Sequence, residues 1–487
     1  MHQQGVKNGK EKEMMDLEEF RQRAHQLVDW MADYYRQIEN FPVKSQVKPG
    51  EILAHLPEQA PEQAEPFQQI FEDFQKVILP GITHWQSPNF FAYFPANSSF
   101  PSVLAEMLTA TLGAQCMIWD TSPAATELEE RVMDWLKQAM GLPTDWQGVI
   151  QDSASTSTLV ALLTAREKFS DFKINQNGLA DFANLRVYCS TETHSSIEKA
   201  VMLAGLGRDN LVKVKIDQKL RLDPEALKKA IVQDLQAGKK PMAVVATLGT
   251  TGTTAIDPLK PIAEICSEYG LWLHVDAAFA GTALLLPEFR WMIEGIEQVD
   301  SFVFNPHKWM FTNFDCSAYF VKNAQALQRT MSVLPEYLKT KTRGQVKEFR
   351  DWGIQLGRRF RALKLWFVLR SFGLQGIRQT LRNHLRWSEE LENWIKARDD
   401  FELMAPRTLN LVCFRYHPPE LNDEPQLDEL NDRLLQEINQ SGKLFLTHTR
   451  VHGRYTLRMV TGQTYLQKRH VEQAWSHIVQ QAQELKG

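Results

Sequence analysis

Cysteine is scarce in this sequence of 487 residues, and the few cysteines present are far apart. Their number is odd and none forms a C-x-x-C pair, which excludes a disulfide-rich secreted scaffold and indicates the reducing cytosol. The five are Cys116, Cys189, Cys266, Cys316 and Cys413. None of the 13 histidines belongs to an H-E-x-x-H motif or a Cys/His cluster, so no metal site is expected.

Long hydrophobic runs and an excess of either charge are also missing. The most apolar stretch, residues 271–286, contains His274 and Asp276 and falls short of the ~18 apolar residues that a membrane-spanning helix needs. Residues 1–14 lack the apolar core of a signal peptide, so a loose tail is expected there. The 55 basic and 59 acidic residues give a formal charge of −4, which leaves no basic surface for nucleic acid or membrane. A small molecule is therefore the expected partner.

What remains is ordinary globular composition, with 43% hydrophobic and 23% charged residues, in a chain long enough for two or three domains. Residues 1–85 are predicted to form a helical arm. Asp16 to Glu19 have capping-box spacing, and apolar residues follow at helical intervals as far as Tyr35. Repeated prolines then interrupt regular structure before a helix predicted at 67–78. Because such an arm has no core of its own, it should pack on the main body or on a second subunit.

Residues 86–385 alternate between amphipathic helical segments and short β-rich runs, which predicts βαβ crossovers and an α/β fold with a mainly parallel sheet. The strand candidates are 187–188, 211–216, 242–247, 271–275, 302–304 and 317–321. Residues 386–487 are predicted to form a small α+β domain. Strands are expected there at 409–415, 444–447 and 454–459, with a helix at 426–438 and another at the end of the chain.

Lys308 stands in the run Asn305-Pro306-His307-Lys308-Trp309, directly after the apolar segment 301–304. A lone lysine is usually a solvated surface charge. Here its neighbours are a proline, a histidine and aromatic residues, which is poor surface composition, and ligands of open α/β sheets bind where the parallel strands end. A lysine that is desolvated at such a place has a lowered pKa and becomes a nucleophile.

Asp276 ends the apolar run 271–275, where an unpaired charge would be costly. It should therefore have a cationic partner, and the protonated pyridine nitrogen of a cofactor is one. A helix cap or an arginine pair is an equal alternative when the residue is considered alone. His194 follows another predicted strand, and a lone histidine is more often structural.

The small hydroxyl-rich turn Ser153-Ala154-Ser155 leads from the apolar pair 149–150 into a helical segment. Such a turn can hold a phosphate, because free amides and the helix dipole face the ligand, although serines there are usually only caps. Thr247, at the end of a predicted strand, is a further candidate cofactor contact. The run 248–254 lacks the G-x-x-x-x-G-K-[ST] pattern and is expected to be a turn.

In their order along the chain, Ser153-Ala154-Ser155, His194, Asp276-Ala277-Ala278 and Asn305 to Lys308 resemble the group II pyridoxal phosphate (PLP)-dependent amino-acid decarboxylases, most closely the aromatic-L-amino-acid decarboxylases. The likeness runs from Asp16 to the final helix. It includes Pro80-Gly81-Ile82-Thr83-His84-Trp85, Phe90-Phe91-Ala92-Tyr93-Phe94-Pro95, Ala124-Ala125-Thr126-Glu127-Leu128-Glu129 and Leu356-Gly357-Arg358-Arg359-Phe360.

The resemblance implies the PLP-dependent transferase fold type I and an obligate homodimer, in which the arm wraps the partner and the active sites lie at the interface. PLP supplies the electron sink that decarboxylation needs. In such enzymes Lys308 would hold the cofactor covalently, Asp276 would pair with its pyridine nitrogen and His194 would stack on its ring. The remaining cofactor-binding residues would be Ser153, Ala154, Ser155, Thr247, Ala278, Asn305 and His307, with the serines, Ala154, Asn305 and His307 on the phosphate side.

The family also has a mobile loop after the lysine that closes over the partner's site and carries a tyrosine in Tyr-Leu-Lys, here Tyr337-Leu338-Lys339. The matching role of Tyr337 is to protonate the Cα carbanion, a task that suits a positioned phenol. Phenylalanine at this place accompanies oxidative aldehyde synthesis in relatives, so Tyr337 favours simple decarboxylation, as does His194. The loop is about two residues shorter than in the animal enzymes, so its gating should differ.

The expected substrate pocket contains Tyr93, Phe94, Pro95, Gln115, Met117 and Trp119. Gln115 and Met117 stand where animal relatives carry more apolar or aromatic residues. The expected reaction is decarboxylation of an aromatic L-amino acid (DOPA, tyrosine, tryptophan or 5-hydroxytryptophan class) to the amine and carbon dioxide. Three alternatives stay open: decarboxylation of a non-aromatic amino acid, oxidative aldehyde synthesis, and a non-catalytic protein that keeps the fold.

Overall fold

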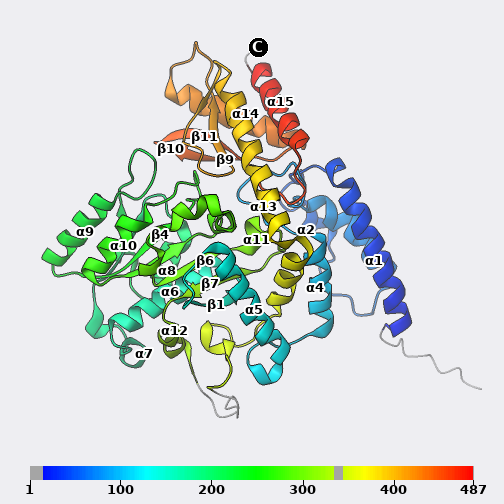
Figure 1. Cartoon of the computed structure of the whole chain (residues 1–487). Helices are drawn as coiled ribbons and strands as arrows, with labels where there is room; N and C mark the ends of the chain where they lie inside the picture. Colours follow the sequence, from blue (N-terminus) through cyan, green and yellow to red (C-terminus); the bar gives the residue numbers. More distant parts are fainter. Residues whose placement is uncertain (1–14, 334–343, 486–487) are drawn as a thin grey trace, which may run out of the picture.

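The computed structural model describes residues 15–333 and 344–485 and contains two β-sheets (Figure 1). The larger sheet has seven strands in the order β1-β7-β6-β5-β4-β2-β3. β7 is antiparallel to both of its neighbours, and the other pairs are parallel. The strands are β1 (Gln147–Gln151), β2 (Leu185–Ser190), β3 (Leu211–Val214), β4 (Lys240–Thr247), β5 (Trp272–Asp276), β6 (Ser301–Phe304) and β7 (Ser317–Val321). The fold is therefore α/β with a mainly parallel sheet, as predicted.

Helices cover both faces of this sheet, so its central strands are buried on both sides and must be apolar along their whole length. One face packs against α5 (Pro123–Met140), α9 (Pro224–Gln236), α10 (Leu259–Tyr269) and the first part of α13 (Arg361–Lys396). The other face packs against α6 (Ala154–Phe169), α8 (Ser195–Leu203) and α12 (Ala324–Met331).

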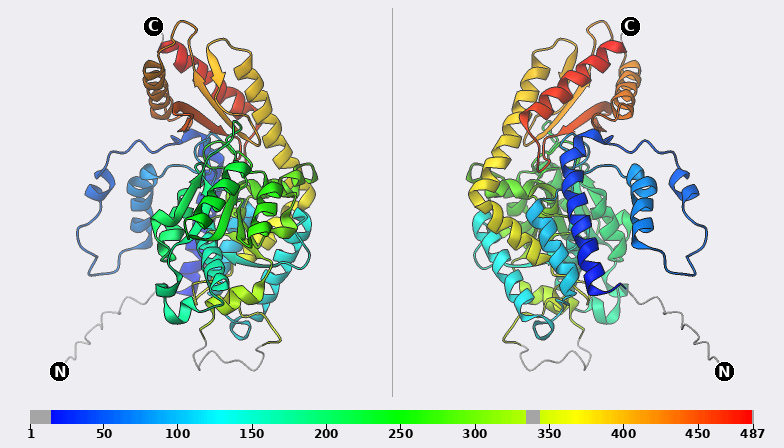
Figure 2. Two further views of the ribbon diagram at one scale, coloured as in Figure 1. Left: turned by 90° about the vertical axis from the view of Figure 1, so that its left-hand side faces the viewer. Right: turned by 90° about the vertical axis from the view of Figure 1, so that its right-hand side faces the viewer.

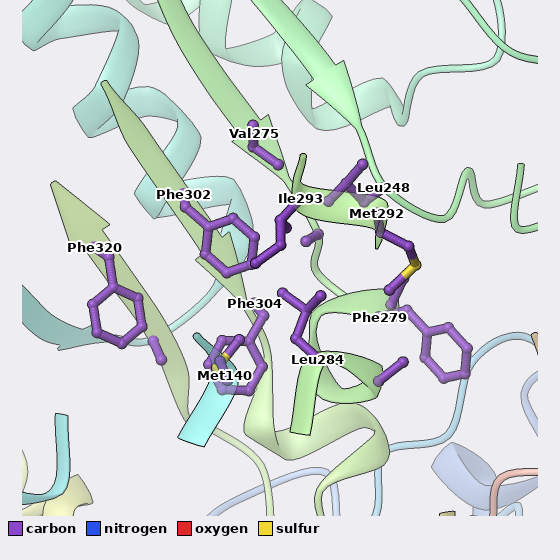
Figure 3. Close-up of a cluster of buried hydrophobic side chains, with 14 of the residues drawn as sticks. Met140, Leu248, Val275, Phe279, Leu284, Met292, Ile293, Phe302, Phe304 and Phe320 are labelled. Carbon is purple, nitrogen blue, oxygen red and sulfur yellow. The ribbon is translucent and has the colours of Figure 1, made fainter. Parts of the chain in front are cut away.

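Strand β6 contributes side chains to the hydrophobic cores on both faces of the sheet. Phe302 and Phe304 point into the first core and Val303 into the second, because successive side chains of a strand face opposite sides. Figure 3 shows the first core, which the two phenylalanines share with Met140 and Leu284. The packing fixes the end of β6, and therefore the start of the segment that carries Lys308.

The smaller sheet has four antiparallel strands in the order β10-β11-β9-β8. Its strands are β8 (Phe401–Leu403), β9 (Leu411–Tyr416), β10 (Thr447–Val451) and β11 (Arg454–Val460), and its helices are α14 (Glu424–Gln440) and α15 (Lys468–Glu484). Helix α13 contributes apolar residues to the cores of both sheets and bends at Gly373, whose φ is 60°. The predicted boundary between residues 385 and 386 lies inside this helix, and the division into three parts stays a proposal.

The N-terminal segment is unusually exposed. Helix α1 (Leu17–Gln37) begins at Asp16, whose side chain accepts a hydrogen bond from the Glu19 amide, yet none of its 21 residues is buried. It runs along the flank of the body beside α4 (Phe100–Leu112), and the segment with α2 (Glu51–His55) and α3 (Phe67–Asp73) projects to one side (Figure 2). Within the described part of the chain, no helix has the length and apolar character needed to cross a membrane.

The predicted strands between 187 and 321 are confirmed as β2 to β7, and the helix predicted at 426–438 is confirmed as α14. The strand predicted at 444–447 is wrong, because β10 begins only at Thr447. Strand β8 and the short α7 (Ile174–Asn177) were not predicted. The helix predicted at 67–78 is α-helical only as far as Asp73 and continues to Ile78 as a π-turn.

Candidate active site

Lys308 lies on the short helix α11 (Pro306–Trp309), which follows the end of β6 directly. Its backbone is clamped by Asn97, a fully buried residue whose side-chain amide donates to the Lys308 carbonyl at 2.8 Å and to the Gly462 carbonyl at 2.7 Å. The Asn97 side-chain oxygen accepts from the amide of Thr464 at 3.0 Å. One asparagine therefore fixes the lysine relative to the segment that follows β11.

The Lys308 ammonium points toward the ring of Phe94, 5.4 Å from its centroid. Desolvation lowers the pKa of this amine, and the nearby charge of Asp276 opposes that shift only in part. More of the amine is therefore neutral, and nucleophilic, than in a lysine exposed to water.

Asp276 is buried at the end of β5, where it pairs with Thr247 at the end of β4. One of its carboxylate oxygens accepts from the amide of Ala278 at 3.0 Å, and the Ala278 carbonyl accepts from the amide of Asn305 at 2.9 Å. The Thr247 hydroxyl is buried and has no hydrogen-bond partner within residues 15–333 and 344–485. This edge of the sheet thus carries a buried carboxylate and a free hydroxyl.

His194 is the residue immediately before α8 and caps that helix, because its Nδ1 accepts from the amide of Ser196 at 3.1 Å. Desolvation lowers the pKa of His194, Asp276 acts in the opposite direction, and Lys308 reinforces the lowering. His194, Asp276 and Lys308 are thus close enough to influence one another. The imidazole is exposed in the single chain, so it can accept a flat ligand against its face.

The residues predicted for the phosphate side follow β1 and β6, the strands on either side of β7. Ser153 caps the 16-residue helix α6 by accepting from the Thr156 amide at 3.2 Å, so the amino end of this helix, where free amides can bind an anion, lies just after the end of β1. Asn305 accepts from the Ser317 hydroxyl at 2.6 Å, and Ser317 pairs with Gln151 at the end of β1.

His307, on the same side, is buried, and burial lowers its pKa to about 3, so its ring is neutral. Its Nδ1 accepts from the Cys316 amide at 2.9 Å, which leaves the proton on Nε2 as a donor.

Phe94 is the predicted pocket residue that the structure brings to the lysine. Its ring stacks on Phe279 at a centroid distance of 4.0 Å, and Phe279 stacks in turn on Trp309 at 5.1 Å. Tyr93, the residue before Phe94, is half exposed and has a positive φ of 50°. Pro95 is buried behind them. A rigid aromatic wall therefore stands beside the amine.

Arg458 of β11, like Asn97, is a residue of the site that was not predicted from the sequence. Its buried guanidinium lies 5.6 Å from the Phe94 ring centroid. It donates to the carbonyls of Thr251 and Gly252 at 2.7 and 2.9 Å and to the Thr447 hydroxyl at 2.9 Å. The sequence feature that could have identified Arg458 is the presence of an arginine inside an otherwise apolar predicted strand. Asn97 had no such signal, since its contacts reach more than 200 residues along the chain.

The other predicted pocket residues belong to a different neighbourhood. Gln115, Met117 and Trp119 each form a hydrogen bond with the segment 348–358. The Gln115 side-chain oxygen accepts from the Arg358 amide at 3.3 Å, the Met117 carbonyl accepts from the Arg350 amide at 2.9 Å, and the Trp119 amide donates to Glu348 at 3.1 Å. Gln115 also lies against Gly357, where an added Cβ would be 3.6 Å from its side-chain oxygen.

Two of the sequence motifs meet in one buried ion pair. Glu129 of α5 accepts from the Arg358 guanidinium at 2.6 Å and from the Ile150 amide at 2.8 Å. Arg358 also donates to the Ile150 carbonyl at 2.9 Å. The ion pair therefore links α5 and β1 to the segment that contains Gly357. It also helps to position Gln115, whose side-chain oxygen accepts from the Arg358 amide.

A mainly parallel seven-stranded sheet, with an amine, a carboxylate and a helix amino end at its carboxyl edge, defines a PLP-dependent enzyme of fold type I. Three features fit this cofactor: the buried Thr247 hydroxyl, which has no partner among the described residues, the nucleophilic Lys308 amine, and the anion-binding end of α6. Tyr337, predicted to donate a proton, lies outside the described residues, as do Leu338 and Lys339.

Comparison with known proteins agrees with this class. Residues 49–417 match the pyridoxal-dependent decarboxylase conserved domain. Tyrosine decarboxylase 2 of Narcissus pseudonarcissus is 44% identical over 478 residues, which cover 96% of this chain and 95% of that protein. Phenylacetaldehyde synthase of Arabidopsis thaliana is 43% identical over 485 residues, covering 98% of each chain.

A solved structure gives the same result. The Oryza sativa TDC with PLP and tryptamine superposes with a TM-score of 0.95 at 35% identity, covering 98% of this chain and 100% of that one. The chain therefore belongs to the pyridoxal-dependent decarboxylase family. It is a PLP-dependent carboxy-lyase.

Proposed function

We propose that this enzyme decarboxylates an aromatic L-amino acid to the arylalkylamine and carbon dioxide. The observation that carries the proposal is the position of the Lys308 amine, between the Asp276 carboxylate and the aromatic wall of Phe94 and Phe279. The relatives named above support the aromatic class, since their names refer to tyrosine, phenylacetaldehyde and tryptamine.

Each side chain has a distinct task in this proposal. Lys308 binds the cofactor covalently through its neutral amine, and Asp276 pairs with the protonated pyridine nitrogen. PLP, when bound, supplies the electron sink for the carbanion left by carbon dioxide. The amino end of α6, with Ser153, Ala154 and Ser155, holds the phosphate together with Asn305 and the neutral His307.

The remaining residues cover the face of the cofactor ring, orient the substrate and supply the proton for its Cα. His194 covers one face of the ring, and Thr247 donates its free hydroxyl. Phe94, with Tyr93 and Pro95, orients the substrate's aromatic group and excludes water. Tyr337 returns the proton to Cα, as a phenol placed for general acid catalysis can.

A substrate with an acidic side chain is a weaker candidate, although Arg458 places a cation near Phe94. Three of the five N–H groups of Arg458 already donate to oxygens of the protein, so most of the hydrogen-bonding capacity of this guanidinium is used within the chain. Oxidative aldehyde synthesis is favoured only by the relationship to a phenylacetaldehyde synthase. Tyr337 opposes it.

The proposal includes a homodimer with shared active sites. Helix α1 exposes Leu17, Phe20 and Val28, and α4 exposes Leu104 and Leu108. A hollow of about 270 Å³ between these helices is lined almost entirely by apolar side chains. Exposed apolar surface of this kind is typical of a protein interface. If a partner subunit covers this surface, the segment with Gln115, Met117 and Trp119 of one chain would lie at the active site of the other. Residues 1–85 would act as the arm.

We also propose a cytosolic location. All five cysteines are buried free thiols, as expected where disulfides are kept reduced.

A substrate panel tests the reaction and the substrate class together. Purified enzyme loaded with PLP is incubated with L-tyrosine, L-DOPA, L-tryptophan, 5-hydroxy-L-tryptophan, L-phenylalanine, L-glutamate and L-2,4-diaminobutyrate, and the amine, aldehyde and peroxide are each measured. We expect amine from one or more aromatic substrates, with little aldehyde or peroxide. Turnover confined to glutamate or diaminobutyrate would refute the aromatic assignment, and stoichiometric aldehyde and peroxide would refute simple decarboxylation.

Mixed dimers test whether Tyr337 acts in the partner's site. Lys308→Ala and Tyr337→Phe chains are each expected to make little amine alone. Coexpressed with different affinity tags, they form hybrid dimers in which one of the two sites has both residues intact, if the tyrosine crosses the interface. Purified hybrids should then recover about half of the wild-type amine production per dimer. Hybrids that remain inactive would place Lys308 and Tyr337 in the same chain's site, and a Tyr337→Phe homodimer with wild-type amine output would rule out the proton-donor role.

A further inference from the structure

A buried polar array lies directly beneath Asp276. His274 is two residues earlier on β5, so its side chain is on the same face of the strand, and it is completely buried. Its Nδ1 is 2.9 Å from the Ser301 hydroxyl on β6, and its Nε2 is 3.3 Å from the Thr158 hydroxyl on α6. Trp272, at the start of β5, donates its indole N–H to the same Ser301 oxygen at 3.1 Å.

The donors and acceptors of this array match a neutral imidazole. Trp272 can only donate, so Ser301 accepts from it and keeps one proton to give. A neutral imidazole has one donor and one acceptor nitrogen, and each faces a hydroxyl that can serve as either. Burial lowers the pKa of His274 to about 4, although the charge of Asp276 opposes the shift, so the ring carries no charge at neutral pH.

The charge state of His274 matters because of what surrounds Asp276. In the part of the chain that the structure describes, no arginine or lysine forms an ion pair with Asp276, and its carboxylate accepts a hydrogen bond from the Ala278 amide. The charge of Asp276 acts on the pKa of His194, His274 and Lys308. A charged His274 would be a permanent counterion for Asp276 and would compete with any cation that arrives from the site.

We propose that His274 is a positioning residue for the cofactor: the array of Trp272, Ser301, His274 and Thr158 holds an uncharged imidazole beneath Asp276. The carboxylate thereby has no permanent counterion beside it and is left free to pair with the pyridine nitrogen of PLP. This inference rests on the role proposed above for Asp276. It assigns His274 no contact with cofactor or substrate, since two hydrogen-bond partners already occupy its ring nitrogens.

The test measures PLP affinity of the apoenzyme, by fluorescence titration, alongside the melting temperature of the same apoenzyme. His274→Phe fills the space but removes both hydrogen bonds, and we expect the dissociation constant of PLP to rise roughly 10-fold or more, the scale on which outer-shell partners affect a bound group. His274→Gln, neutral and able to hydrogen-bond, should recover most of the affinity. The matched control is His477→Phe, because His477 is a largely buried histidine of α15 that is hydrogen-bonded to Ser441 at the end of α14, and its replacement should leave PLP affinity unchanged.

The result that overturns the inference is a folded His274→Phe apoenzyme with wild-type PLP affinity, since a purely structural histidine would lower only the melting temperature. If this variant does not fold, Thr158→Val and Ser301→Ala can be used instead. Each removes one hydrogen-bond partner of the His274 ring and changes the volume of the substituted side chain only slightly. They should weaken PLP binding about 3-fold or more, and wild-type affinity in both would refute the proposal. Asp276→Asn is measured in parallel. If it binds PLP normally, the role of Asp276 fails and the inference falls with it. If Asp276→Asn binds weakly and the His274 variants bind normally, only the inference fails.

Discussion

Lys308→Ala is expected to abolish the visible absorption of the bound cofactor and to reduce amine production by roughly 10³-fold or more, the scale on which loss of a nucleophile disables an enzyme. The amine of Lys308 is desolvated, and the charge of Asp276 acts on it. The measurement is the absorption spectrum of PLP-loaded protein together with the initial rate of amine release.

Lys322→Ala provides the matched control. Lys322 follows the end of β7, at the edge of the sheet opposite to Lys308, and donates to the Glu297 carbonyl at 2.8 Å. Its replacement should leave both the spectrum and the rate close to wild type. A Lys308→Ala protein that keeps the absorption and more than about a tenth of the activity would contradict the assignment, because loss of the nucleophile should cost far more.

Glu129→Ala should destabilise the enzyme by about 3–5 kcal/mol, because it leaves the Arg358 guanidinium buried without its counterion and removes the acceptor of the Ile150 amide. Chemical denaturation of the apoenzyme, followed by circular dichroism, measures the change. The control is Glu130→Ala in the same helix. Glu130 forms a half-exposed ion pair with Lys347 at 3.5 Å, and the loss of such a pair should cost less than about 1 kcal/mol.

A second change separates the charge from the packing. In the double variant Glu129→Ala, Arg358→Met, the unpaired charge is gone, so part of the lost stability should return. If Glu129→Ala and Glu130→Ala are equally mild, the buried pair does not hold the segment around Gly357, and the link between the two motifs is wrong.

The larger sheet could be predicted because its strands are short, apolar and separated by amphipathic helices, as in the run 302–304 of β6. The same criterion failed at residues 444–446. Leu444, Phe445 and Leu446 are apolar and buried, but Phe445 pairs its backbone with residues 89 and 91 outside the sheet. The real edge strand, β10, alternates partly buried and exposed positions before the buried Val451 and reads Thr-His-Thr-Arg-Val, which hydrophobicity does not single out.

The site was predictable where its residues stand at strand ends or helix starts, as Asp276, Ser153 and Asn305 do. What the sequence could not reveal are the contacts made across long separations. Asn97 reaches Lys308 and Gly462, Glu129 reaches Arg358, and neither spacing follows a helix or strand period. Only the folded chain shows that these polar residues are buried and which partners satisfy them.

The central claim is that PLP is bound covalently at Lys308. Reduction of the PLP-loaded enzyme with borohydride, followed by proteolysis and mass spectrometry, locates the modified residue. We expect one phosphopyridoxyl group per chain, on the peptide that contains Asn305 to Trp309, with the fragment ions assigning it to Lys308. A modification on another lysine, or none after saturation with PLP, would contradict it.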